Sequence, residues 1–213
     1  MSVPRGVRIA AFASLALFLL ALGAALRPLA LPEKHSAAPV LDAIEIGFAQ
    51  DMTAHHQQAL LMTQRLDPAA SPTVRRVAEQ LADAQRVEIG TMLGWLRLAD
   101  ASPLSPRPMA WMTDTLASHR HSAHAPDTPM PGMATTAELD ALAASRGRDA
   151  EILFLQLVIR HHQGGIAMAQ AADRQLTEGP VKEAARAMIQ SQGQEVGVMS
   201  LLLTQLGGAL LPR

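Results

Sequence analysis

The sequence predicts an all-α protein in which two duplicated helical hairpins form a four-helix bundle. Aromatic residues make up 3% of the 213-residue chain and Tyr is absent, so residues that favour strands are few. Hydrophobic residues make up 49%, which is enough to bury a sizeable core. One pattern of residues occurs twice, and each copy fits a pair of helices.

The repeated pattern joins two motifs. The first motif is Glu-x-x-Phe-x-Gln followed by His-His-Gln and a Met. It comprises Glu45, Phe48, Gln50, His55, His56, Gln57 and Met62, and then Glu151, Phe154, Gln156, His161, His162, Gln163 and Met168. The second motif, Gln-x-x-Glu-x-x-x-Met, comprises Gln85, Glu88 and Met92, and then Gln192, Glu195 and Met199. The shared spacing predicts matching environments around a pseudo-twofold axis.

Apolar residues recur at intervals of three and four in both halves, which indicates amphipathic helices. We expect four main helices near 42–66, 72–98, 149–177 and 180–206. Ser71-Pro72 and Pro180 suit helix starts, and the short connections make each pair an antiparallel hairpin. The bundle domain is therefore 42–206, with a first hairpin at 42–99, a linker at 100–135 and a second hairpin at 136–206.

The N-terminal segment is predicted to be an export signal. Arg5 and Arg8 precede an apolar run at 9–26, which is typical of a cleaved signal peptide or of a retained signal anchor within 1–27. Residues 28–41 then form a linker. We expect the bundle to lie outside the cytoplasm, periplasmic or secreted, and to be held at the membrane by 9–26 if the segment is not cleaved.

Charge and composition exclude several classes of function. Eighteen basic and nineteen acidic side chains give a net charge of -1, which argues against nucleic acid as a partner. The chain has no Cys, no Glu-x-x-His pair for a di-iron site, no phosphate-binding Gly loop and no Ser-centred elbow. We therefore expect a protein that is not an enzyme and has no organic cofactor. A homo-oligomer is compatible with the sequence.

Polar residues fall within the predicted helix seams, the apolar stripes along which neighbouring helices pack against each other. Neighbouring helical residues point about 100° apart, so one His of each pair faces the seam squarely, and we assign this role to His55 and His161. Counting back from the loops places Gln85 nearly level with His55, Glu88 about a turn away, and Glu195 nearly level with His161. A His–carboxylate contact is therefore geometrically reasonable. The layer is either a structural hydrogen-bonded network or a metal site. Imidazole and thioether ligands together favour Cu(I) or Ag(I).

The two motifs resemble the domain-of-unknown-function 305 family, and the resemblance covers roughly 42–206. It implies a ferritin-like helical bundle, exported or membrane-anchored, with copper or silver binding in some members. The metal-binding residues that it implies are His55, His56, Met62, Glu88, Met92, His161, His162, Met168, Glu195 and Met199. The halves differ where Met52 of the first corresponds to Val158 of the second, and where Gly164-Gly165 replaces a bulkier pair.

The linker is a second candidate metal site. It holds six of the fourteen prolines and a group of soft or borderline ligands: Met109, Met112, His119, His121, His124, Met130 and Met133. We expect a short helix near 109–118 and another that begins at a Thr135/Glu138 capping box and ends near 145. The sequence thus predicts an extracytoplasmic protein that sequesters Cu(I) or Ag(I). The alternative is a structural or interaction module of the envelope without a metal.

Overall fold

The computed structural model describes residues 14, 16–22, 40–112 and 130–211. Residues 1–39 and 40–213 form separate units, and the bundle lies in the second. All regular secondary structure of the described residues is helical, which confirms the all-α prediction. Most of the predicted export segment lies outside the described residues. Where the chain is described, it contains no helix that is both long and apolar enough to cross a membrane.

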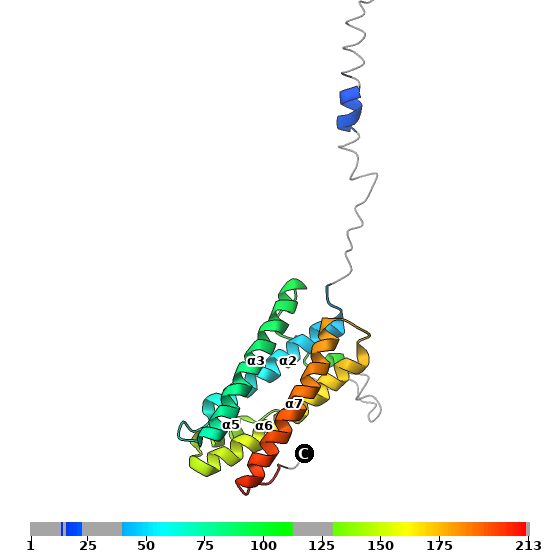
Figure 1. Cartoon of the computed structure of the whole chain (residues 1–213). Helices are drawn as coiled ribbons and strands as arrows, with labels where there is room; N and C mark the ends of the chain where they lie inside the picture. Colours follow the sequence, from blue (N-terminus) through cyan, green and yellow to red (C-terminus); the bar gives the residue numbers. More distant parts are fainter. Residues whose placement is uncertain (1–13, 15, 23–39, 113–129, 212–213) are drawn as a thin grey trace, which may run out of the picture. The chain divides into compact units, whose positions relative to one another are not determined.

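Four long helices build the bundle (Figure 1): α2 (Ala43–Arg65), α3 (Pro72–Leu98), α6 (Gly147–Gln175) and α7 (Pro180–Gln205). Each end lies within two residues of its predicted position. Two short elements, the 3-10 turn η1 (Ala110–Met112) and helix α5 (Thr136–Ala144), lie between the hairpins in sequence. The helix expected near 109–118 is thus only a 3-10 turn within the described residues, and 113–118 lie outside them.

Helix starts follow from local capping chemistry. The Asp42 carboxylate accepts hydrogen bonds from the backbone N–H of Ile44 and Glu45, and Thr135 with Glu138 forms the predicted capping box of α5. Ser71 caps α3 directly before a proline at the first helical position, and Pro180 occupies the same position in α7. These residues explain why the sequence located the helix starts so closely.

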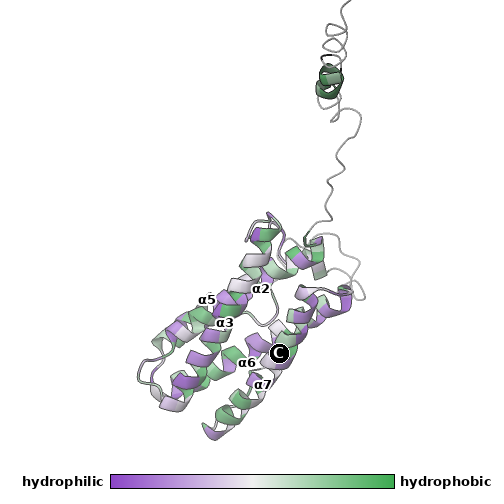
Figure 2. Ribbon diagram, turned by 45° about the horizontal axis from the view of Figure 1, so that its top comes forward, coloured by the Kyte–Doolittle hydropathy of each residue, from purple (hydrophilic) through white to green (hydrophobic). Residues whose placement is uncertain are grey.

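The two hairpins meet through their first helices. α2 packs against α6, while α3 covers α2 and α7 covers α6. The loop between α2 and α3 is tied to the start of α6, because Glu151 accepts a 2.5 Å hydrogen bond from the Ser71 N–H and Asp67 accepts a 2.7 Å bond from the Gly147 N–H. Hydrophilic and hydrophobic residues are interleaved along the helices, as expected for amphipathic segments (Figure 2).

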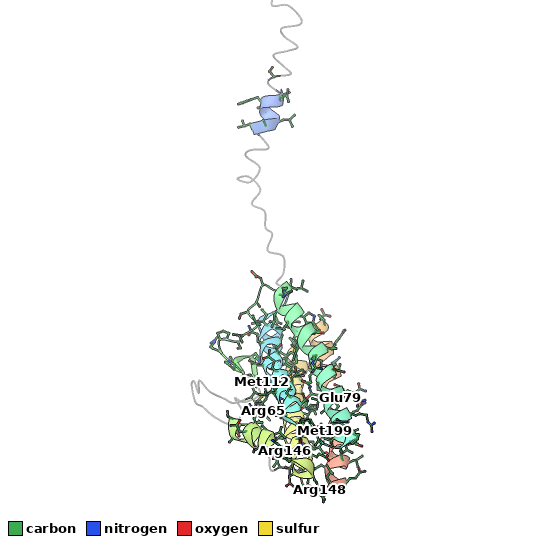
Figure 3. The ribbon with its side chains drawn as sticks, turned by 90° about the vertical axis from the view of Figure 1, so that its left-hand side faces the viewer. Arg65, Glu79, Met112, Arg146, Arg148 and Met199 are labelled. Atoms are coloured by element: carbon green, nitrogen blue, oxygen red, sulfur yellow. The ribbon has the colours of Figure 1, made fainter. Side chains whose placement is uncertain are left out.

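The core divides into two clusters. The methionine-rich cluster surrounds Phe48 and contains six buried methionines: Met52, Met92, Met109, Met112, Met168 and Met188. The leucine-rich cluster surrounds Phe154 and contains two, Met62 and Met199. Met112 and Met199, one from each cluster, are labelled in Figure 3. The helical positions of the repeated histidines place them between these two clusters.

Gly90 offers a test of the exposed face of α3. It lies in the helix interior, and a Cβ at this position meets no atom within 4 Å. Gly90→Ala should therefore raise the free energy of unfolding by about 0.5–1 kcal/mol, because alanine loses less backbone entropy on folding. Urea unfolding measures this change. A destabilised variant would mean that the face of α3 is covered by something absent from this structure.

Candidate metal site

The innermost part of the candidate site is a pair of stacked imidazoles. His55 from α2 and His161 from α6 are each 1% exposed, and their ring centroids lie 3.7 Å apart with planes inclined by 29°. His161 Nε2 lies 2.9 Å from the carbonyl oxygen of His55, and His55 Nε2 lies 3.1 Å from that of Pro131. The structure thus confirms that these two histidines form the inner pair.

The outer histidines are equally buried but face the other way. His56 Nε2 lies 2.6 Å from a carboxylate oxygen of Glu88, and His162 Nε2 lies 2.7 Å from one of Glu195. The expected pairing of Glu195 with His161 is therefore wrong. One residue further along a helix turns the side chain by about 100°, so the second His of each pair points toward the covering helix and its carboxylate.

Together the four histidines form one layer in which every ring has the same hydrogen-bonding pattern. A carbonyl or carboxylate oxygen can only accept, so each Nε2 carries the proton and donates it. In the neutral ring the lone pair is then on Nδ1. All four Nδ1 atoms, of His55, His56, His161 and His162, are buried without a hydrogen-bond partner. Metal-binding histidines in proteins usually donate their second ring N–H to a carboxylate or carbonyl in this way.

Electrostatics keep the inner pair neutral. Burial, with smaller contributions from the neighbouring His56 and His162, lowers the pKa of His55 from its ordinary value of 6.5 to about 3. Burial also lowers the pKa of His161 well below 6.5, assisted by the other three rings. Neutral imidazoles are the form that binds metals. The inner lone pairs are therefore available throughout the physiological pH range.

These shifts predict an acid-sensitive bundle. Below pH 6.5 the unfolded chain binds protons at His55 and His161 that the folded protein does not, so stability falls as the pH drops from there toward about 3. Arg160 lowers the pKa of Glu138 to about 2, so this carboxylate affects stability only below its ordinary value of 4.5.

Urea unfolding between about pH 7 and pH 5 therefore tests the histidines above the range in which Glu138 contributes. The free energy of unfolding should decrease across this window, and the double variant His55→Gln/His161→Gln should show a weaker dependence. A wild-type free energy that stays constant from pH 7 to 5 would show that the inner pair does not stay neutral on folding.

The repeated glutamines belong to the same layer. Gln85 and Gln192 are each 2% exposed, and Gln85 Oε1 and both amide atoms of Gln192 lack partners. Gly165 makes room for the second amide, because a Cβ there would lie 2.5 Å from Gln192 Oε1. Sequence reasoning placed these glutamines in the seam but did not include them among the candidate ligands. Their recurrence in both motifs was the available signal.

The predicted methionine ligands do not gather around one histidine. Met62 follows His55 by seven residues, about 10 Å along the helix axis, and lies in the leucine-rich cluster. Met92 follows Glu88 by four residues and lies in the methionine-rich cluster, on the other side of the layer, because α3 runs antiparallel to α2. Met168 shares the cluster of Met92, and Met199 shares that of Met62.

The two sides of the layer differ in sulfur content. Met52 precedes His55 by one helical turn and lies with Met92 in the methionine-rich cluster, whereas its counterpart Val158 precedes His161 in the leucine-rich cluster. Met52 was noted in the sequence but not included among the candidate ligands. The methionine-rich side therefore offers two thioethers within about one turn of the layer, and the other side offers Met199.

Hard-ligand coordination finds no support in the described part of the chain. No three His, Asp or Glu side chains converge there as a metal site. Glu88 and Glu195 are already engaged by His56 and His162. Of the linker candidates, His119, His121 and His124 lie outside the described residues, while Met130 and Met133 are partly buried. Their ligand roles remain predictions.

A buried carboxylate that the sequence did not flag secures the chain after α3. Asp51 Oδ2 accepts hydrogen bonds from the Met109 N–H at 2.6 Å and from Trp111 Nε1 at 2.8 Å. Burial raises the pKa of Asp51, against the effect of these two donors. Asp51 thereby holds Met109 and Met112 in the methionine-rich cluster. Its counterpart in the second repeat is Leu157, so the repeat itself gave no signal.

The chain is thus a duplicated four-helix protein. Its two antiparallel hairpins meet at a layer of four buried histidines. Residues 45–203 match the model of the family described as domain of unknown function (DUF305), and the chain belongs to this family. No curated protein sequence matches the chain significantly.

Solved structures support the same assignment. A DUF305 protein from Streptomyces coelicolor, inferred to be secreted, is 36% identical with a TM-score of 0.70, covering 80% of this chain and 96% of its own. A DUF305 fragment from Deinococcus radiodurans is 28% identical with a TM-score of 0.63, covering 77% and 97%. CopM in its Cu(II)-bound form is 25% identical with a TM-score of 0.54, covering 76% and 96%.

Proposed function

We propose that this protein is an extracytoplasmic metal-binding protein that sequesters or buffers Cu(I), and Ag(I) by the same chemistry. The observation that carries the proposal is the histidine layer. Its four rings direct Nε2 to carbonyl or carboxylate oxygens and keep Nδ1 without a partner, and the layer lies between the methionine-rich and the leucine-rich cluster. If the layer served only to fix the register of the helices, each of its buried nitrogens would be expected to have a hydrogen-bond partner.

The donor set fits a soft monovalent ion. Imidazole nitrogen and thioether sulfur are the ligands that Cu(I) favours, and this ion is satisfied by few ligands, so it does not need three converging hard groups. The chain has no Cys. Thioethers stay neutral and form no disulfides, which suits them to an oxidising compartment. We assign the first ligands to His55 and His56 with Met52 and Met92, the sulfur-rich side of the layer.

The comparisons support copper as the bound metal and a location outside the cytoplasm. CopM, which shares the fold, exists in a Cu(II)-bound form. The Streptomyces relative is inferred to be secreted, in agreement with the basic flank and apolar run at the N-terminus of this chain. We further propose binding rather than catalysis, because the sequence lacks the motifs of the enzyme classes that use such bundles.

The thioether assignment is tested by two matched double variants. Met52→Leu/Met92→Leu removes both sulfurs nearest the layer on the methionine-rich side, and Met62→Leu/Met199→Leu removes both buried sulfurs of the leucine-rich cluster. Leucine keeps the volume, so each substitution should cost less than about 1.5 kcal/mol of stability.

Competition with a Cu(I) chelator should then separate the variants. The first pair should lose at least about tenfold in affinity, the loss that even a supporting residue of a metal site produces, and the second pair should stay near wild type. Equal affinities in both would remove Met52 and Met92 as ligands. If instead replacing His119, His121, His124, Met130 and Met133 abolishes binding, the linker is the site. A wild-type protein that retains no Cu(I) would support the structural-module alternative.

A further inference from the structure

A strap of main chain covers the inner histidines. The strap is defined as residues 130–134, the end of the linker before α5. Its Pro131 carbonyl accepts the hydrogen bond from His55 Nε2 at 3.1 Å, and Gly132 lies so close to α6 that a Cβ there would be 3.0 Å from the Cα of His161. The strap therefore lies against the His55 ring and against the main chain of α6 at His161.

The close approach depends on glycine on both sides. Gly132 has φ +77, which glycine adopts without strain. On α6, a Cβ at Gly164 would lie 1.9 Å from the Pro131 carbonyl oxygen and 2.4 Å from its carbon. The corresponding residue of the first repeat is Gln58, a long side chain. This difference between the repeats, which the sequence showed without explaining, allows the strap to lie on the second hairpin.

The strap is held unevenly along its length. At its C-terminal end, the Gln58 amide makes two hydrogen bonds with the Ala134 backbone, of 2.7 and 2.9 Å, and Arg160 forms a bidentate ion pair with Glu138 of α5. Nearer the histidines, the described residues form the bond from His55 to the Pro131 carbonyl and a 3.4 Å bond from the Met133 N–H to the Met130 carbonyl, while Met130 packs against the methionine-rich cluster. Residues 130–132 can therefore lift while Ala134 stays in place.

We propose that the strap is the gate through which a metal ion enters and leaves the histidine layer. Among the described residues, lifting 130–132 breaks the His55–Pro131 hydrogen bond, the 3.4 Å bond from the Met133 N–H to the Met130 carbonyl and the packing of Met130, and it leaves the helices in place. Opening also frees His55 Nε2 and so releases the orientation of that ring. The proposal rests on the proposed function for the identity of the ion, but the covering of His55 is independent of it.

Gly164→Ala is the direct test, since its Cβ cannot coexist with the closed strap. In the metal-free full-length protein, carbethoxylation of His55 by diethyl pyrocarbonate, followed by mass spectrometry, should accelerate by about tenfold, the effect of losing roughly one hydrogen bond from the closed state. In the Cu(I)-loaded protein, transfer to a chelator should accelerate by a similar factor, with unchanged helicity by circular dichroism.

Gly90→Ala is the matched control, because it places the same methyl group in open space on α3. Gln58→Ala, which removes the two bonds to Ala134, is a second route to a loosened strap if Gly164→Ala folds poorly, and it should accelerate both rates. Unchanged His55 labelling in the loosened variants overturns the proposal. Faster labelling with unchanged Cu(I) transfer overturns it as well. If the wild type binds no Cu(I), the proposed function fails, and His55 labelling alone decides whether the strap gates the layer.

Discussion

The fold depends on burying four imidazoles where two helical hairpins meet. An unpaired buried polar group costs about 1–3 kcal/mol, so each ring needs a partner for its proton. The chain supplies Glu88 and Glu195 from the covering helices and the carbonyls of His55 and Pro131 from the main chain. This arrangement fixes the register of α3 on α2 and of α7 on α6. It also leaves Nδ1 of each ring without a hydrogen-bond partner, and these are the nitrogens that we propose as metal ligands.

Departures from the twofold pattern give the layer two different sides. Met52 and Val158 occupy equivalent positions, as do Asp51 and Leu157, and Gln58 and Gly164. On one side Met52 adds a thioether and Asp51 holds Met109 in the methionine-rich cluster, and on α6 Gly164 leaves room for the strap. The duplicated hairpin therefore provides a symmetric frame, and a few differences between the repeats give the layer one sulfur-rich side and allow the strap to pack against α6. This asymmetry is the reason that we propose a single ion beside the methionine-rich cluster and not two equivalent ions.

The sequence predicted the frame well because its signals are local. Asp42, Ser71 and Pro180 mark helix starts through capping chemistry, and the repeat fixed which helices pair. It also identified His55 and His161 as the inner pair, since residues at the centre of an apolar stripe face the seam. The sequence could not show that Met62 and Met92 lie on opposite sides of the layer. That depends on how three antiparallel helices are positioned along one another in the bundle. The strap, and the bonds from Asp51 to Met109 and Trp111, are contacts between segments that are distant in the sequence. A single sequence carries no periodic pattern that would predict such contacts.

The central claim is that the Nδ1 lone pairs of the layer bind the ion. Nitrogen-15 NMR of the histidine side chains tests this most directly, with Ag(I) as a diamagnetic probe that shares the ligand preferences of Cu(I). In the metal-free protein the buried rings should show protonated Nε2 and unprotonated Nδ1. Addition of Ag(I) should shift the Nδ1 signals of His55 and His56 while their Nε2 atoms keep their protons. A shift confined to Nε2, or no change at any of the four buried rings, would contradict the account.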